Sequence, residues 1–326
     1  MENNFVNKLY KTLKSGQTVE DTLKRTKLTR DELEVGISLL ERSGKHIGII
    51  NKNGVEYISK RYKSSFLYPK NNPLELFHEL ILVVSDTHYG NKVCQPSLVN
   101  RAYQKAYDLG VKTALHVGDL LDGDYVKIRP EQQYQLFAHG YDEQTDYFLD
   151  MYPEVEGITT YFIQGSHDET HIKNGGADPA KKFVEKRKDF VYLGQDNGIY
   201  SLGGNVDIML SHPGGGCADS LSYKPQKAIE NMTPGNKPKI LLVGHYHKYY
   251  YMNYRNVHAF EVPCLCGQSQ FMAKMGLDNV MGALFLDVHY DKLGNVHFID
   301  VDEMMFNSED YVPNDYQRAR KLVIKR

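Results

Sequence analysis

The chain has 326 residues, of which 41% are apolar and 25% are charged, and its formal net charge is −2. These values are typical of a globular protein with one large and one smaller domain. The apolar runs are too short to span a bilayer, the first residues lack signal-peptide character, and the four cysteines form no CxxC pair. These features exclude a membrane-spanning chain, a disulfide framework and a cysteine-based zinc cluster, so we expect a cytoplasmic protein with no membrane partner.

Residues 1–65 differ from the rest of the chain in charge. They hold 13 basic and 8 acidic side chains, whereas the remainder holds 26 and 33. The apolar spacing predicts three helices, and Asn53-Gly54 between two apolar runs predicts a closing hairpin. The order helix, helix, helix, hairpin resembles a winged helix-turn-helix, a DNA-binding module. We therefore expect residues 1–65 to form this module, with Lys45 and Lys52 of its basic wing contacting DNA.

Acidic side chains at the start of the third predicted helix leave an alternative open. Asp31, Glu32 and Glu34 would repel the phosphates of DNA, although anions suit the positive end of a helix. A protein-contact or purely structural role for residues 1–65 therefore stays in competition with DNA binding.

Residues 66–78 are expected to be a linker, because Asn71-Asn72-Pro73 is a turn-forming run. From residue 79 to residue 326, strands and helices alternate in the pattern of a layered α/β domain. Short apolar runs predict buried strands at 81–84, 113–117, 158–163, 206–210 and 240–243. Helices are expected at 96–109 and 132–152, and alternation beyond residue 249 predicts further strands.

Each of the five predicted buried strands ends in a polar cluster. These clusters are Asp86-Thr87-His88, Gly118-Asp119, Gly165-Ser166-His167-Asp168, Ser211-His212 and Gly244-His245-Tyr246-His247. Ligands of open α/β sheets bind outside the carboxyl ends of the strands, so we expect these side chains to converge. Each cluster alone is more typical of a cap or a hydrogen-bonded core residue. Five of them in register predict a site for divalent transition metals, which imidazole and carboxylate groups bind well.

These motifs, in this order, resemble those of the calcineurin-like metallophosphoesterases, namely D-x-H, G-D-x-x-[DE], G-N-H-[DE], a histidine after a strand, and G-H-x-H. The resemblance covers roughly Leu80 to Ser269 and is nearest to the branch with the recombination nucleases and the small subunits of archaeal D-family polymerases. It implies an α/β/β/α sandwich in residues 79–326 and two divalent metal ions, with Mn²⁺ expected and Fe²⁺ or Zn²⁺ as alternatives.

The resemblance implies six metal ligands: Asp86, His88 and His247 for metal one, His212 and His245 for metal two, and Asp119 bridging both. It also makes His167, beside Asp168, the catalytic group that protonates the leaving oxygen. Asp122 either orients a metal ligand or caps a helix. The chain departs from the family at Ser166, where an asparagine is usual. Ser166 remains a candidate ligand of metal two, but a hydroxyl is a poorer ligand than an amide carbonyl. Metal two therefore either takes the seryl oxygen or a water, or lacks one protein ligand.

Lys224 and His139 are weaker candidates, as groups that contact the phosphate of a substrate. The function that these features predict is metal-dependent hydrolysis of phosphodiester bonds in DNA. A phosphatase or cyclic-nucleotide phosphodiesterase acting on a small substrate is one alternative, and an inactive DNA-binding or polymerase-accessory protein is another. DNA is the expected partner, and a homodimer is the other association considered.

Overall fold

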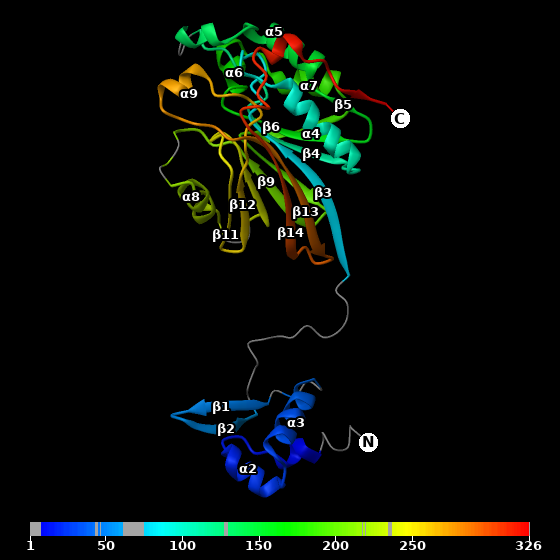
Figure 1. Cartoon of the computed structure of the whole chain (residues 1–326), viewed down its shortest axis with the longest axis vertical. Helices are drawn as coiled ribbons and strands as arrows, with labels where there is room; N and C mark the ends of the chain where they lie inside the picture. Colours follow the sequence, from blue (N-terminus) through cyan, green and yellow to red (C-terminus); the bar gives the residue numbers. More distant parts are fainter. Residues whose placement is uncertain are drawn as a thin grey trace. The chain divides into compact units, whose positions relative to one another are not determined.

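The computed structural model describes residues 8–42, 45, 47–60, 75–126, 130–216, 218, 220–233 and 237–325. The chain divides into two compact units, Met1–Pro73 and Leu74–Arg326, which are described separately (Figure 1). Among the residues that the structure describes, no helix is both long and apolar enough to cross a membrane.

The first unit contains helical residues at 8–12, then α2 (Val19–Thr26), α3 (Arg30–Arg42) and the strands β1 (Gly48–Lys52) and β2 (Val55–Ser59). Thr29 and Glu32 form a capping box at the start of α3, where the Glu32 carboxylate accepts from the Thr29 amide at 2.8 Å. The strands pair antiparallel around Asn53-Gly54. The predicted element order is thus confirmed, whereas assignment as a DNA-binding winged helix stays a prediction.

The second unit is built on two sheets. The six-stranded sheet has the order β14 (Val296–Phe306), β13 (Met281–Asp291), β3 (Leu76–Val84), β4 (Thr113–Val117), β6 (Thr159–Gln164) and β7 (Phe190–Gln195). The five-stranded sheet has the order β11 (Tyr250–Tyr254), β12 (Val257–Glu261), β10 (Ile240–Val243), β9 (Val206–Ser211) and β8 (Asn197–Leu202). In each sheet the central strands are parallel and antiparallel strands lie at one edge or both.

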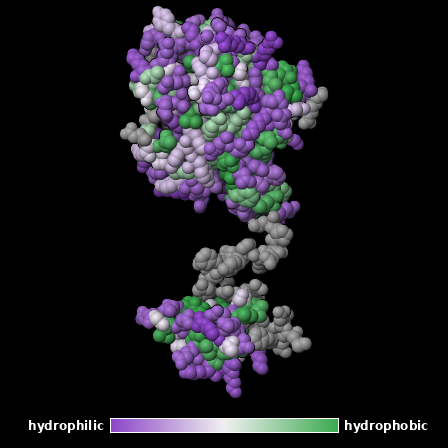
Figure 2. All heavy atoms as spheres, viewed as in Figure 1, coloured by the Kyte–Doolittle hydropathy of each residue, from purple (hydrophilic) through white to green (hydrophobic). Residues whose placement is uncertain are grey.

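Apolar side chains from the facing sides of the two sheets form one continuous core. The outer face of the six-stranded sheet packs against α4 (Pro96–Asp108), α5 (Gly140–Met151) and α7 (Pro179–Lys186). The outer face of the five-stranded sheet packs against α8 (Tyr223–Asn231). This is the expected α/β/β/α order of layers (Figure 1). The surface of this unit is mostly hydrophilic in the view of Figure 2, with apolar side chains only in scattered patches.

Shorter elements complete the second unit. They are a 3₁₀ helix η1 (Pro130–Gln135), β5 (Glu154–Val155), α6 (Glu169–Gly175), α9 (Gln270–Lys274), α10 (Asp315–Arg318) and β15 (Val323–Ile324). Short β15 pairs parallel with β5.

Two sequence-based boundaries differ from the structure by more than one residue. Residues 132–152 were expected to form one helix, but η1 ends at Gln135 and α5 begins only at Gly140, whose φ is +71°. Between them the Phe137 amide donates to the carbonyl of Gly90, outside any helix. The other difference is that β3 begins at Leu76, inside the predicted linker 66–78, because it pairs with β13 as far as Asp291. Residues 66–74 lie outside the described residues.

Candidate metal centre

The loops that follow β3, β4 and β10 share an uncommon backbone conformation. Their φ angles are positive at Asp86 (49°), His88 (46°), Asp119 (50°), His245 (79°) and His247 (55°). A residue with a side chain in this left-handed region costs roughly 1–3 kcal/mol, and such strain is kept mainly at functional sites. All five residues belong to the predicted metal ligands, so the strain coincides with the candidate site.

Asp86, His88 and His247 form the first ligand group. Oδ1 of Asp86 lies 3.2 Å from Nε2 of His247 and 3.7 Å from Nε2 of His88. The two imidazoles face each other, with their Nε2 atoms 3.2 Å apart. All three side chains are buried. The structure therefore brings together the residues that the resemblance assigned to metal one.

Asp119, His212 and His245 form the second ligand group, with one ligand atom of each within 4.8 Å of the others. Oδ2 of Asp119 lies 2.9 Å from Nε2 of His212. A side chain at Gly118 would collide with the ring of His212, which explains the glycine before Asp119. The half-buried His245 directs Nε2 to the carbonyl of Gly215 at 2.6 Å.

The two groups adjoin. Asp119 also lies within 4.8 Å of ligand atoms of Asp86 and His88, and Nε2 of His212 lies 3.8 Å from Oδ1 of Asp86. Both atoms are buried and lack a hydrogen bond of good geometry in the described part of the chain, and their short contacts, with Asp119 and His247, are to other members of the two ligand groups. A buried polar atom without a partner costs about 1–3 kcal/mol, and a bound cation would remove this cost. The donor set and its unpaired atoms therefore fit two divalent metal ions.

A model of the calcineurin-like phosphoesterase family matches residues 80–264, which include both ligand groups. The chain belongs to the calcineurin-like phosphoesterase family. It is thus a metal-dependent phosphoesterase with the buried dinuclear histidine and aspartate site typical of that family.

Solved structures that match the chain include an archaeal phosphodiesterase, which is 14% identical with a TM-score of 0.39. The match covers 70% of this chain and 99% of the archaeal chain. Another is Vps29 of Entamoeba histolytica complexed with zinc, 14% identical, with a TM-score of 0.35 and the same coverage of 70% and 99%. The comparison with curated proteins finds no match.

Two imidazoles of this phosphoesterase have raised pKa values. Burial opposes the charge on His212, but Asp119 and Asp86 raise its pKa to about 9. Burial likewise opposes the charge on His247, but Cys264 and Asp86 raise its pKa to about 10. Near neutral pH both rings are therefore protonated in the metal-free protein, and each must lose a proton to bind a metal ion.

We expect the affinity for Mn²⁺ to weaken as the pH falls from about 8.5 to about 7, because protons then compete with the metal for His212 and His247. The apparent association constant should fall by up to about tenfold per pH unit for each of the two imidazoles. Titrations with Mn²⁺, followed by electron paramagnetic resonance of the free ion at several pH values, would measure it. An affinity independent of pH would show that neither ring gives up a proton on binding.

Asp122 supports the first ligand group from behind. Its Oδ1 lies 3.0 Å from Nδ1 of His88, and its Oδ2 accepts from the amide of Asn91 at 3.1 Å. A carboxylate on the far nitrogen of a metal-binding imidazole fixes the orientation of the ring. The contact is the one expected of an orienting Asp122, and no helix begins at this residue, as the capping alternative would require.

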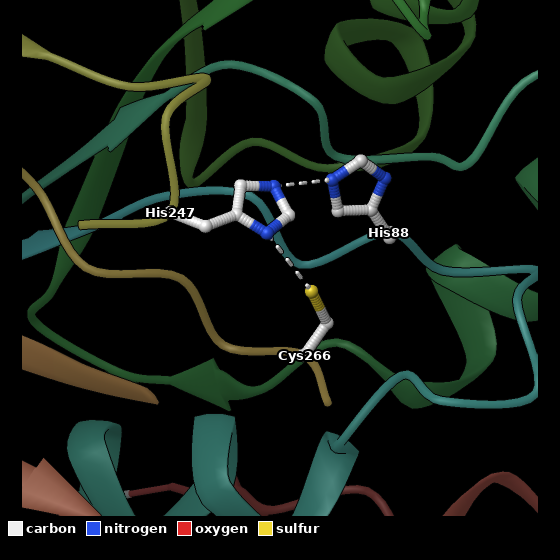
Figure 3. A group of neighbouring side chains, drawn as sticks. All are labelled: His88, His247 and Cys266. Atoms are coloured by element: carbon white, nitrogen blue, oxygen red, sulfur yellow. Dashed lines mark hydrogen bonds between the residues drawn. The ribbon is translucent and has the colours of Figure 1, made fainter. Parts of the chain in front are cut away.

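Cys266 contacts the far nitrogen of His247, forms a possible ligand group with His88 and His247, and was not among the predicted site residues. Its Sγ lies 3.9 Å from Nδ1 of His247, while Nε2 of the same ring faces His88 (Figure 3). Cys266 also lines the cavity beside the site. A search for CxxC spacing does not find this cysteine. The sequence feature that marks it is the C-x-C pair Cys264–Cys266 downstream of G-H-x-H.

His167 directs one ring nitrogen at the site. Its Nδ1 donates to the carbonyl of Asp122 at 2.7 Å, and the hydroxyl of Tyr125 contacts the same nitrogen. Its Nε2 lies 3.9 Å from Oδ2 of Asp119, and the side chain is 31% exposed. Because Nδ1 holds a proton against the carbonyl, a second proton would sit on Nε2, facing the site. This geometry is compatible with the predicted general acid.

Asp168, predicted as a catalytic residue beside His167, contacts the backbone, and its catalytic role stays a prediction. Its carboxylate accepts from the backbone amides of Gly165, Leu120 and Leu121 at 2.9, 3.2 and 2.8 Å. It is completely buried and does not line the cavity. By accepting from amides of both loops, the Asp168 carboxylate joins the loop after β4 to the loop after β6. It thereby positions Asp119 relative to His167.

A cavity of about 460 Å³ opens beside the two ligand groups. Its polar lining includes His88, Asp119, His167, His245 and His247. Its apolar lining comes from α9 and the following residues, namely Phe271, Met272, Met275 and Leu277. Ser166 also lines the cavity, and its part as a metal ligand stays a prediction.

Lys224 and His139 do not line this cavity, and their part in substrate binding stays a prediction. Lys224 lines a separate cavity of about 160 Å³ with Pro213 and Gly214. His139 is exposed at the start of α5, where its Nδ1 lies 3.2 Å from Oε1 of Gln133.

Proposed function

We propose that this phosphoesterase hydrolyses phosphodiester bonds in DNA, with Mn²⁺ as its metal, and that residues 1–65 bind the DNA. The observation that carries the proposal is the pair of adjoining ligand groups, faced by Nε2 of His167 at the edge of one cavity. Two divalent ions bound there supply Lewis acidity and lower the pKa of a coordinated water.

The chain's own residues supply the remaining chemistry. Asp122 and Cys266 hold the rings of His88 and His247 with Nε2 toward the site. His167, held at Nδ1, gives a proton from Nε2 to the oxygen that leaves the phosphorus. Such a proton is needed most when the leaving oxygen is an alkoxide, as it is in DNA.

Two features support DNA as the substrate. The cavity lining includes the half-buried Phe271, whose ring offers a face on which a base can stack. The basic excess of residues 1–65 suits a phosphate backbone, and Lys45 and Lys52 are both exposed there. A small-substrate phosphatase or cyclic-nucleotide phosphodiesterase is the second candidate, because about 460 Å³ is also the size of a pocket for one small ligand.

The test compares labelled single- and double-stranded DNA, an aryl phosphodiester and an aryl phosphomonoester, each with Mn²⁺ and with Mg²⁺. We expect DNA and the diester to be cut in Mn²⁺ and the monoester to be cut more slowly. Lys45→Gln with Lys52→Gln should weaken DNA binding and reduce its salt dependence by about one unit per lost contact, leaving the diester rate unchanged. Lys274→Gln on α9 is the matched surface control.

Each alternative has its own result in these assays. A monoester cut faster than DNA and the aryl diester would favour the phosphatase. Tight DNA binding without turnover in either metal would favour an inactive binding protein.

A further inference from the structure

A second cluster of histidine and aspartate side chains lies on the three strands β3, β13 and β14. His78 of β3 is paired in register with His289 of β13. Asp287 stands two residues before His289 on the same side of β13. Asp300 of β14 is the cross-strand partner of Asp287. All four therefore face the same side of the six-stranded sheet. Figure 1 shows these strands running on past the covering helices.

The ligand atoms of this cluster converge. Nδ1 of His78 lies 3.0 Å from Oδ1 of Asp287, and Nε2 of His289 lies 3.4 Å from Oδ2 of the same carboxylate. Nε2 of His289 also lies 3.8 Å from Oδ2 of Asp300. One ligand atom each of His78, Asp287 and His289 fits within 4.8 Å of the others.

His289 is held in place before any ligand arrives. Its ring is stacked between His78, with centroids 5.1 Å apart, and Phe298, with centroids 4.0 Å apart. The planes of the two imidazoles are 11° from parallel, and the metal-binding lone pair lies in the ring plane, so the 63% exposed His78 must turn its ring for both nitrogens to reach one ion. Nε2 of His289 is buried and makes no hydrogen bond with the described part of the chain. A fixed imidazole whose buried nitrogen faces two carboxylates is suited to a metal ion, because imidazole and carboxylate groups bind divalent transition metals well.

The spacing matches one metal in particular. Zn²⁺ binds imidazole nitrogen and carboxylate oxygen at about 2.0–2.2 Å in a tetrahedron, which places neighbouring ligand atoms roughly 3.3–3.6 Å apart. Nδ1 of His78 and Nε2 of His289 lie 3.0 and 3.4 Å from the two oxygens of Asp287, which is close to that separation. Two imidazoles with carboxylates also favour Zn²⁺ over Mg²⁺ or Ca²⁺, which prefer oxygen ligands alone.

An ordinary histidine–aspartate pair occurs nearby and looks different. Nε2 of His297 lies 3.1 Å from Oδ2 of Asp291. The carboxylate of Asp291, however, also accepts from the backbone amides of Leu293 and Asn295 and from the Asn295 side chain, so its oxygens are already satisfied. His297 also belongs to none of the groups of three ligand atoms in the described residues.

We propose that His78, Asp287 and His289 bind one Zn²⁺ ion, with Asp300 or a water as the fourth ligand. This site is separate from the dinuclear centre, because His78 stands eight residues before Asp86 along β3 and its loop. At about 3.3 Å per residue that separation is roughly 26 Å. The ion would join β3 to both strands of the β13–β14 hairpin.

Zinc content of the full chain tests the site. After removal of metals with a chelator and dialysis against Zn²⁺, atomic absorption should find one more ion per chain in the unmodified protein than in Asp287→Asn or His289→Gln. His297→Gln is the matched control and should keep the full content. Direct titration should show the affinity of this one site weakened at least tenfold in either variant. Equal content and affinity in all four proteins would overturn the proposal.

A spectroscopic measurement separates this site from the dinuclear centre. Asp119→Ala, which damages only the dinuclear centre, should still take up one Co²⁺ with the strong visible absorption of four-coordinate cobalt. Adding Asp287→Asn to that variant should remove this absorption. Absence of the band from Asp119→Ala, in a protein whose circular dichroism is native, would equally refute the site. Neither result depends on which phosphoester the enzyme hydrolyses.

Discussion

Asp119→Ala is expected to reduce hydrolysis of an aryl phosphodiester to the uncatalysed background. The Asp119 carboxylate lies 2.9 Å from His212 and within 4.8 Å of the ligand atoms of Asp86 and His88. The substitution therefore removes an anionic ligand from both metal positions, and chemistry that needs paired ions fails without them. Initial rates and metal content per chain, measured on the same preparation, would test this. Near wild-type turnover would contradict the dinuclear assignment.

Asp122→Asn is the graded control for that experiment. The amide keeps the shape of the side chain but loses the charge that faces Nδ1 of His88 at 3.0 Å. Substituting such an outer partner of a metal ligand costs roughly 10–100-fold in metal affinity or activity. A loss as complete as that of Asp119→Ala would mean that Asp122 itself binds metal, as its place in a group with His88 and His167 would allow.

His167→Ala is expected to lower DNA hydrolysis by roughly 10²–10⁴-fold, the usual contribution of a general acid. Metal content should stay unchanged, because Nδ1 of His167 is engaged by the Asp122 carbonyl and Nε2 stands 3.9 Å from Asp119. An aryl diester should suffer less, since a nitrophenolate leaves without a proton. Rates on both substrates, with metal analysis, would separate these effects.

Two outcomes would contradict the role of His167. Loss of metal from the variant would make this imidazole a ligand instead of an acid. An equal loss of rate on DNA and on the aryl diester would indicate that His167 positions the substrate without protonating its leaving group.

The local sequence pattern was sufficient to predict the five buried strands and the ligand motifs at their ends. The predicted bounds 113–117 and 240–243 are those of β4 and β10, because short buried runs of apolar residues have few alternatives in a layered domain. The motifs at their ends converge because parallel strands end at the same edge of a sheet. The expected helix 132–152 was wrong, since its break depends on a hydrogen bond to Gly90, far away in sequence.

The direction of a side chain depended on packing that no local pattern contains. Asp168 is adjacent to His167 in sequence, yet it turns to backbone amides in the loop after β4. Cys266 meets His247 only because the chain returns beside the dinuclear centre after β12.

The pairing of His78 with His289 is the clearest case of such dependence on the tertiary structure. The two residues are separated by most of the second unit and meet through the antiparallel register of β3 with β13. Periodicity along a chain determines which residues are buried and where a strand ends, because both follow from local spacing. It carries no information about which strand becomes the neighbour or in which register, since these depend on how the sheets assemble.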